Sequence, residues 1–270
     1  MIENGSCRAP PNMNCVSRHL FVTPVSPFSH ASGAEQRSAL LLQALRQVGT
    51  VDVLQMAPGK ATRVWREEAA AQRESLHDTV HAEVGAADGM RRYRPKPELT
   101  RAVERAFGRP LSAYGLIMGR YVWSLCQLEL PPGVATLIDL DDFRYRYGSE
   151  AGWSPALVKE RVVKALNHRL ARRQLRRFDA AFVVSERDKT LLNGMPSCLL
   201  PNVPWSVPET VTPVPADKRV LFVGSLWYRP NADGIDWFLA KVWPAIRVAE
   251  PSATLQLVGS AAAGRRAGWE

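Results

Sequence analysis

The sequence predicts an α/β protein with a doubly wound parallel sheet, and two patterns along the chain support this prediction. Short apolar runs, such as His19–Thr23 and Val51–Gln55, have the length and composition of strands that are buried on both faces. Segments with helical spacing of apolar residues separate these runs, and Ala34–Val48 is the clearest of them. Strands that alternate with helices in this way form a parallel sheet with helices on both sides.

The later elements of the first domain follow from the same two patterns. Strands are expected at Gly115–Met118, Thr136–Leu140, Ala180–Val184 and Ser197–Leu200. Helices are expected at Glu98–Phe107, at Leu157–Phe178 and after Ser185, whose hydroxyl stands at an N-cap position. Between about Ala61 and Val84 the chain is polar and rich in alanine, and this helical segment is expected to be an insertion or a surface helix.

Composition divides the chain into two domains. Residues 1–18 have no continuous apolar run and are expected to form a loosely ordered leader. Residues 19–202 form the first domain, and the four prolines within residues 203–218 predict a stiff linker. Residues 219–270 contain a strand, a glycine turn, a helix and a second strand, so they are expected to form an incomplete second Rossmann-like domain.

Positive charge is concentrated in one predicted helix. The chain of 270 residues has a formal net charge of +9, and the segment Leu157–Phe178 holds eight basic residues against one acidic residue. Because the charge is local and no helix-turn-helix pattern is visible, a nucleic-acid partner is not expected. The apolar residues of this helix are expected to face the core. They are Val162, Val163, Leu166, Leu170 and Phe178.

The basic face of that helix has two interpretations, a solvated surface or a peripheral contact with anionic lipid headgroups. The sequence contains no uncharged apolar run of about eighteen residues, so no transmembrane helix is expected. The protein is therefore expected to be cytoplasmic, with a reversible contact at the inner face of the membrane. Screening by salt would weaken such a contact.

Charged residues follow two predicted strands of the first domain. Asp139 and Asp141 lie at the end of one strand, and Arg120 follows another. Ligands of open parallel sheets bind beyond the carboxyl ends of the strands, so these residues are candidates for a site. Close carboxylates can hold a metal ion or act as a catalytic acid and base, or one of them can cap a turn at a solvated strand end. Arg120 is expected to bind an anionic acceptor, with an ordinary surface arginine as the alternative.

Glycines occupy the loops that link a strand to the next helix in both domains. Gly33 opens the helix Ala34–Val48, and Gly224 with Ser225 follows the first strand of the second domain. A glycine at this place lets backbone N–H groups approach a phosphate, and the helix dipole favours the anion. Arg229 is close enough in sequence to neutralise a diphosphate. An ordinary helix start is the alternative at each glycine.

Four stretches of the sequence resemble the group 1 glycosyltransferases, a large bacterial family of retaining enzymes with the GT-B fold. They are FVTPVSPFSHASGAEQR, LIDLDDF, RRFDAAFVVSERDKTLL with LLPN, and VLFVGSLWYRPNADGIDWFLAKVWPAI. The last is the most specific, because a strand, Gly-Ser, Arg-Pro-Asn and a helix with paired Trp and Phe are common in that family. The resemblance extends from about His19 to Gly259.

The resemblance implies two Rossmann-like domains that face each other across a cleft, with the acceptor on the N-terminal one and the nucleotide-sugar donor on the C-terminal one. By this resemblance Gly33 stands in the N-terminal glycine loop, and Gly224 and Ser225 stand near the donor diphosphate. Asp139 and Asp141 occupy the position where many relatives have a histidine that contacts the donor sugar. No metal ion is usually needed, because basic side chains and helix N-termini stabilise the leaving diphosphate.

Two features depart from the family pattern. The usual PNGVD end of the first domain occurs as Pro201-Asn202-Val203, and the glutamate pair spaced E-x7-E, which holds the donor ribose and sugar, is absent. The donor-binding domain is therefore expected to be truncated. No metal is expected from the chain itself, since His77 and His81 would share a helix face but lack a third ligand.

The expected function is that of a hexosyltransferase. It would transfer a hexose from a nucleotide-sugar, its donor substrate, to a glycan or lipid-linked acceptor in surface polysaccharide biosynthesis, without a cofactor. The alternative is a truncated, non-catalytic remnant of such an enzyme that binds an acceptor or a partner protein.

Overall fold

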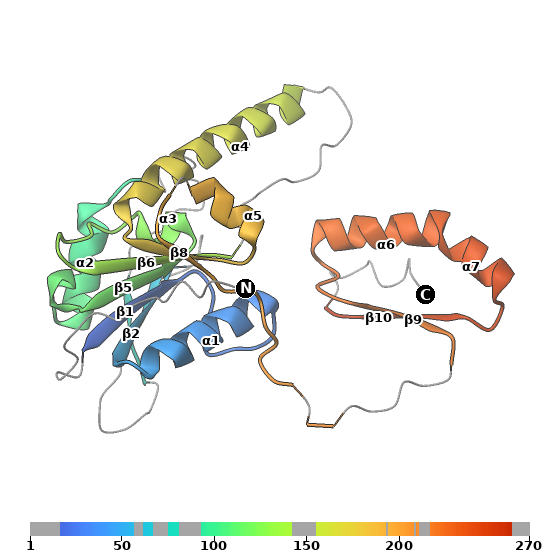
Figure 1. Cartoon of the computed structure of the whole chain (residues 1–270), viewed down its shortest axis with the longest axis horizontal. Helices are drawn as coiled ribbons and strands as arrows, with labels where there is room; N and C mark the ends of the chain where they lie inside the picture. The colour runs from blue at the N-terminus through green and yellow to red at the C-terminus, as the bar shows by residue number, and fades with distance from the viewer. Residues whose placement is uncertain are drawn as a thin grey trace, which may run out of the picture. The chain divides into compact units, whose positions relative to one another are not determined.

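The computed structural model describes residues 17–56, 62–66, 75–80, 93–141, 155–192, 194–207, 209–210 and 217–260 (Figure 1). The chain divides into two compact units, Met1–Trp205 and Ser206–Glu270, which we call unit 1 and unit 2. The leader predicted for residues 1–18 lies outside the described residues, except for residues 17 and 18.

Unit 1 is built on an eight-stranded sheet with the strand order β4-β3-β2-β1-β5-β6-β7-β8. Every strand pair from β2 to β8 is parallel, whereas β3 pairs antiparallel with β2 and with β4. The predicted α/β class and its mostly parallel sheet are thus confirmed, and the fold is compatible with a Rossmann-like one. The strands are β1 (Arg18–Thr23), β2 (Thr50–Gln55), β3 (Thr62–Arg66), β4 (Ser75–Val80), β5 (Leu116–Arg120), β6 (Ala135–Leu140), β7 (Ala180–Val183) and β8 (Ser197–Leu199).

The surface helix predicted between Ala61 and Val84 is wrong, because this segment contributes two strands, β3 and the edge strand β4. Thr62 and Val64 of β3 are fully buried while Arg63 between them is exposed, which is the two-residue alternation of a half-buried strand. Pairing with β2 overrides the helical preference of the alanine-rich sequence nearby. His77 lies in β4, so the helical spacing expected between it and His81 does not apply.

Helices cover both faces of the sheet. α1 packs on one face, where its leucines contact Phe21 of β1 and Met118 of β5. On the other face α2, α3 and the C-terminal end of α4 enclose Leu20 and Val22. Since neighbouring residues of a strand point to opposite faces, β1 contributes to both cores. The helices are α1 (Gly33–Arg46), α2 (Pro97–Phe107), α3 (Val122–Leu125), α4 (Pro155–Gln174) and α5 (Glu186–Lys189), with short 3-10 turns η2 (Leu111–Ala113), η3 (Leu175–Arg177) and η4 (Thr190–Leu192).

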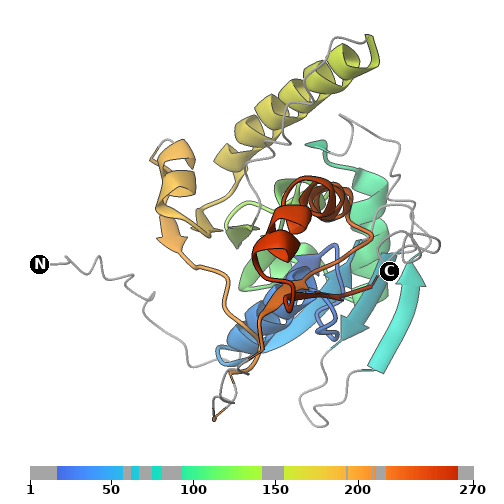
Figure 2. The ribbon, with the colours of Figure 1, turned by 90° about the vertical axis from the view of Figure 1, so that its right-hand side faces the viewer.

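The N-terminal half of α4 reaches away from the sheet, as two views at right angles agree (Figures 1 and 2). Val162, Val163 and Leu166 are 42–52% exposed, so the prediction that they face the core is wrong. Phe178, after the helix, is buried as expected, and Leu170 is partly buried against the core. Among the described residues, no helix is both long enough and apolar enough to cross a bilayer.

Unit 2 has a two-stranded parallel sheet of β9 (Arg219–Val223) and β10 (Thr254–Val258), with α6 (Arg229–Lys241) and α7 (Trp243–Ala249) between them in sequence. The predicted strand, glycine turn, helix and strand are therefore present. Within residues 217–260 nothing covers one face of this sheet, where Leu221 is 56% and Val223 68% exposed. After β10, Gly259 has a φ of +151°, a conformation that side chains rarely adopt.

Candidate functional site

The strand order of unit 1 creates a switch point between β1 and β5. The chain leaves β1 toward β2 on one side, and it leaves β5 toward β6 on the other. The loops that follow the two strands therefore diverge at the carboxyl edge of the sheet. Doubly wound folds bind their ligands in the crevice that this divergence leaves.

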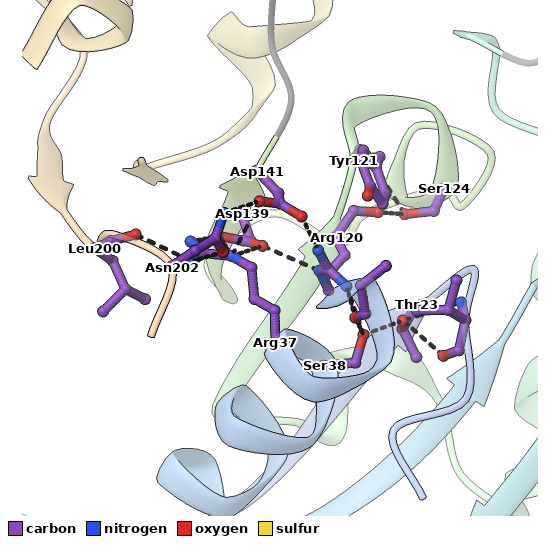
Figure 3. Close-up of polar contacts among 12 residues, drawn as sticks. Thr23, Arg37, Ser38, Arg120, Tyr121, Ser124, Asp139, Asp141, Leu200 and Asn202 are labelled. Carbon is purple, nitrogen blue, oxygen red and sulfur yellow. Dashed lines mark hydrogen bonds and ion pairs between the residues drawn. The ribbon is translucent and has the colours of Figure 1, made fainter. Parts of the chain in front are cut away.

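A buried charge network occupies this edge, and Asp139 of β6 is its centre (Figure 3). The Asp139 side chain has no exposed surface. Its Oδ1 accepts hydrogen bonds from Arg37 Nη2 at 2.6 Å and Nε at 3.2 Å, and its Oδ2 accepts from Arg37 Nε at 3.0 Å and Arg120 Nε at 3.1 Å. Removing an ion from water is costly, so a buried carboxylate persists only with such charged donors around it.

Arg120, at the end of β5, joins three elements from a fully buried position. Besides Asp139, its guanidinium donates to Asp141 Oδ2 at 2.6 Å, to Ser38 Oγ at 2.7 Å and to the carbonyl oxygen of Ala34 at 2.5 Å. The last two partners lie on α1, so Arg120 fixes the start of this helix against β5 and β6. In this conformation the guanidinium has no surface left for an acceptor, and the contact predicted for it stays a prediction.

Arg37 of α1 connects the network to the segment that follows β8. Its Nη1 donates to the carbonyl oxygen of Leu200 and to Asn202 Oδ1, both at 3.0 Å. Asn202 Nδ2 in turn donates to Asp141 Oδ1 at 3.1 Å, which closes a ring of polar contacts. Burial, the largest influence, lowers the pKa of Arg37, but the hydrogen bond and charge of Asp139 and the charge of Asp141 outweigh it, so this pKa is raised and the group stays charged.

The residue after Arg120 has a strained backbone. Tyr121 has a φ of +61° and is the only residue other than glycine with a positive φ in the described part of the chain. The Tyr121 amide donates to the carbonyl oxygen of Asp139, and the Tyr121 carbonyl oxygen accepts a hydrogen bond from Ser124 Oγ. Strain of this kind costs about 1–3 kcal/mol and clusters at functional sites. The sharp turn redirects the chain at the switch point into α3.

The rim of the site contains an exposed glycine and an aromatic pair. A Cβ added at Gly33 would meet nothing within 4 Å, and its φ is not positive, so the described residues do not require glycine here. Ser32 and Glu35 cap this helix end reciprocally. The rings of His30 and Trp205 stack at 3.9 Å between centroids, with Trp205 37% exposed. Gly33 is thus exposed at the start of α1, three residues after the histidine of the aromatic pair.

In unit 2 the three predicted phosphate-binding residues lie together at the start of α6. Arg229 is 74% exposed and its Nε lies 3.3 Å from Asp233 Oδ2. Gly224 has a packing explanation, because a Cβ there would lie 3.2 Å from Asn231 Nδ2, which donates to the carbonyl oxygen of Ser225. Their contact with a phosphate stays a prediction.

The sequence pointed to Arg120, Asp139 and Asp141, and the structure brings these three together. It also adds Arg37 and Asn202, which sequence reasoning missed. Arg37 lies one helical turn after Gly33 and therefore on the same side of α1. This spacing could have indicated that Arg37 faces the same edge of the sheet as Gly33. Nothing in the local sequence around Asn202 indicates that its amide bridges two charged residues.

Within the described ranges, no three side chains of His, Cys, Asp or Glu come together as a metal site would require. Compared with known proteins, the chain matches no protein-family model and no curated protein.

Proposed function

We propose that the chain is a hexosyltransferase of the group 1 type with a GT-B architecture, in which unit 2 belongs to the donor-binding domain. It would transfer a hexose from a nucleotide-sugar to a glycan or lipid-linked acceptor in surface polysaccharide biosynthesis. One observation carries the proposal: the network of Arg37, Arg120, Asp139 and Asp141 lies at the switch point, where doubly wound folds bind ligands.

The buried part of the network supports the proposal because it fixes the elements around the site in one arrangement. Asp139 and Arg120 hold α1, β5 and β6 in one arrangement, which a site for a polar ligand needs. Two members reach solvent: Asp141 is 14% exposed and Asn202 is exposed. A carboxylate and an amide can accept hydrogen bonds from sugar hydroxyls. The exposed ring of Trp205 offers an apolar face of the kind on which a sugar ring can pack.

The donor side of the proposal rests on anion chemistry. Gly33 begins α1 with open space around it, and the N-terminus of a helix favours a phosphate. In unit 2, Arg229 is largely exposed at the start of α6, close in sequence to the hydroxyl of Ser225. A helix N-terminus or an exposed arginine can each stabilise the charge of a diphosphate without a metal ion.

A second candidate is a binding protein that does not turn over its ligand. The specific observation in its favour is that Asp139 and Arg120 are fully buried and engaged with each other. In this arrangement Asp139 has no exposed surface with which to contact a ligand. Under this alternative the site would bind an acceptor or a partner protein through its exposed rim alone.

Calorimetry with uridine diphosphate and guanosine diphosphate tests the proposal on the full chain. One of them should bind, and Gly33→Val should weaken binding by about tenfold or more, since the added side chain covers the helix start without touching the protein. Arg229→Gln should weaken binding too, whereas Lys241→Gln, which removes an exposed cation at the other end of α6, should not. Unchanged unfolding midpoints serve as the control.

A turnover assay separates the two candidates. The enzyme should release nucleoside diphosphate from a nucleotide-sugar, slowly with water and faster with an acceptor. If a diphosphate binds but no diphosphate is released from a nucleotide-sugar, the binding protein is favoured. If neither diphosphate binds, both the proposed donor-binding role of these residues and the transferase activity are contradicted.

A further inference from the structure

The outward side of α4 has an apolar half and a cationic half. Val158, Val162 and Leu166 follow one another at a spacing of four residues, so they share one side of the helix. Their exposed fractions are 40%, 52% and 42%. Arg169 and Arg173 come three and seven residues after Leu166 and continue the same side toward the C-terminus, where both are exposed.

The opposite side of α4 attaches the helix to unit 1. Ala171 is buried in the larger core, and Leu175, in the turn after the helix, is buried beside it. Among the side chains that the structure describes, those that attach the helix lie in its C-terminal half, and the ribbon of the N-terminal half reaches away from the sheet (Figures 1 and 2). The exposed valines and leucine are therefore not part of a core in the described structure.

From this arrangement we infer that the outward side of α4 docks on an anionic lipid bilayer. The inference goes beyond the proposed function, because it concerns a different surface and needs no sugar transfer. The apolar half would enter the boundary between headgroups and acyl chains, and the arginines would lie at the level of the headgroups. Arginine can snorkel toward phosphates while its aliphatic stem contacts the apolar region.

Charge selects a lipid surface over an apolar partner surface. Arg169, Arg173 and Arg176 are exposed and take part in no ion pair within the described residues. The whole segment Leu157–Phe178 contains only one acidic residue, Glu160. An apolar groove in a partner protein would account for the valines and Leu166 but would leave the adjacent arginines without counter-charges. A bilayer rich in anionic lipid satisfies both halves with one planar surface.

Co-sedimentation of the full chain with vesicles tests the inference. Vesicles of phosphatidylcholine mixed with phosphatidylglycerol should bind the protein at low salt, and pure phosphatidylcholine should bind it far less. High salt should weaken the binding because it screens the arginines. An arginine near an anionic surface contributes about fivefold in affinity, so R169Q/R173Q should bind about 25-fold more weakly.

The apolar half is tested by V158Q/V162Q/L166Q, which keeps every charge. It should weaken binding to the anionic vesicles by about tenfold or more. R101Q/R105Q is the matched control, since it removes two exposed arginines from α2 and should bind like the wild type. Circular dichroism of each variant verifies that the fold is retained.

Three results would overturn the inference. One is equal binding, or no binding, to the two vesicle types. Another is a loss of vesicle binding in R101Q/R105Q as large as that in R169Q/R173Q, which would mean that the total charge of the protein, and not α4, governs the contact. The third is a wild-type dimer in sedimentation velocity that V158Q/V162Q/L166Q converts to a monomer without affecting lipid binding, since α4 would then dock on a second copy of the chain.

Discussion

Units 1 and 2 begin with the same local pattern, a strand, a glycine-containing loop and a helix, but they treat their charges in opposite ways. After β1, Arg37 of α1 forms a buried ion pair with Asp139 at 2.6 Å. After β9, Arg229 of α6 is 74% exposed, and its ion pair with Asp233 lies on the surface of the same helix. The difference comes from what surrounds the pattern and not from the pattern itself.

The width of the sheet explains the contrast. In unit 1, β5 and β6 extend the sheet beside β1, so residues at their ends can reach α1 and close over its charges. The sheet described in unit 2 has two strands, and its Leu221 and Val223 remain exposed on one face. Charges there stay in water, where an ion pair contributes little to stability. A strand–glycine–helix motif therefore does not by itself define a buried polar site.

The largest expected effect is on the stability of unit 1. Asp139→Ala would leave the guanidinium groups of Arg37 and Arg120 buried without their shared carboxylate. Breaking a buried ion pair in this way costs about 3–5 kcal/mol. Urea unfolding followed by circular dichroism should show a large fall of the midpoint.

Asp233→Ala is the matched variant in unit 2. It removes one carboxylate from an exposed pair of the same two residue types, so the free energy of unfolding should change by less than about 0.5 kcal/mol. Equal midpoints for the two variants would mean that the network in unit 1 does not stabilise the fold, and the contrast between the units would fail.

A smaller effect is expected at the glycines. In Gly259→Ala the added Cβ would lie 1.8 Å from the carbonyl oxygen of Gly224, at a φ of +151°. We expect the free energy of unfolding of unit 2 to fall by about 1–3 kcal/mol. Gly33→Ala in unit 1 has open space and an ordinary φ, so it should change stability by less than about 1 kcal/mol.

Amide hydrogen exchange would show in which unit the Gly259→Ala variant loses stability. In Gly259→Ala the amide of Gly224, which donates to the carbonyl oxygen of Val258, should exchange faster, while amides of β1 and β5 keep their protection. Unchanged exchange at Gly224 would show that the close approach of the two glycine backbones is not needed in unit 2.

The sequence predicted the parallel strands well, because strands such as β1 and β6 are continuous apolar runs with clear ends. The prediction failed at β3, because pairing with β2 decides the structure there. It also failed at the N-terminal half of α4, because helical spacing shows which residues share a side of a helix but not whether that side has a sheet to pack on. The carboxylates and Arg120 were found because they follow strands. The Arg37 and Asn202 contacts join residues 165 positions apart, which no local pattern records.

The smallest expected effect concerns the exposed ion pair of Lys218 and Glu250, which joins the start of β9 to the end of α7. The hydrogen bond from Lys218, and secondly that from Ser252, lowers the pKa of Glu250 below its usual value. A lowered pKa means that the folded state binds its proton less tightly than the unfolded state does. The stabilisation is thus present above the ordinary pKa and is lost as the pH falls through the lowered one.

In Lys218→Gln, NMR titration of the Glu250 carboxyl should give a pKa closer to the usual value, and high salt should shift the wild-type pKa in the same direction. Ser252→Ala should have the smaller effect, since its hydrogen bond is the weaker influence. If the Glu250 pKa is the same in the wild type and in Lys218→Gln, the Lys218–Glu250 pair does not stabilise the charged carboxylate measurably, and this surface pair contributes nothing to the stability of unit 2.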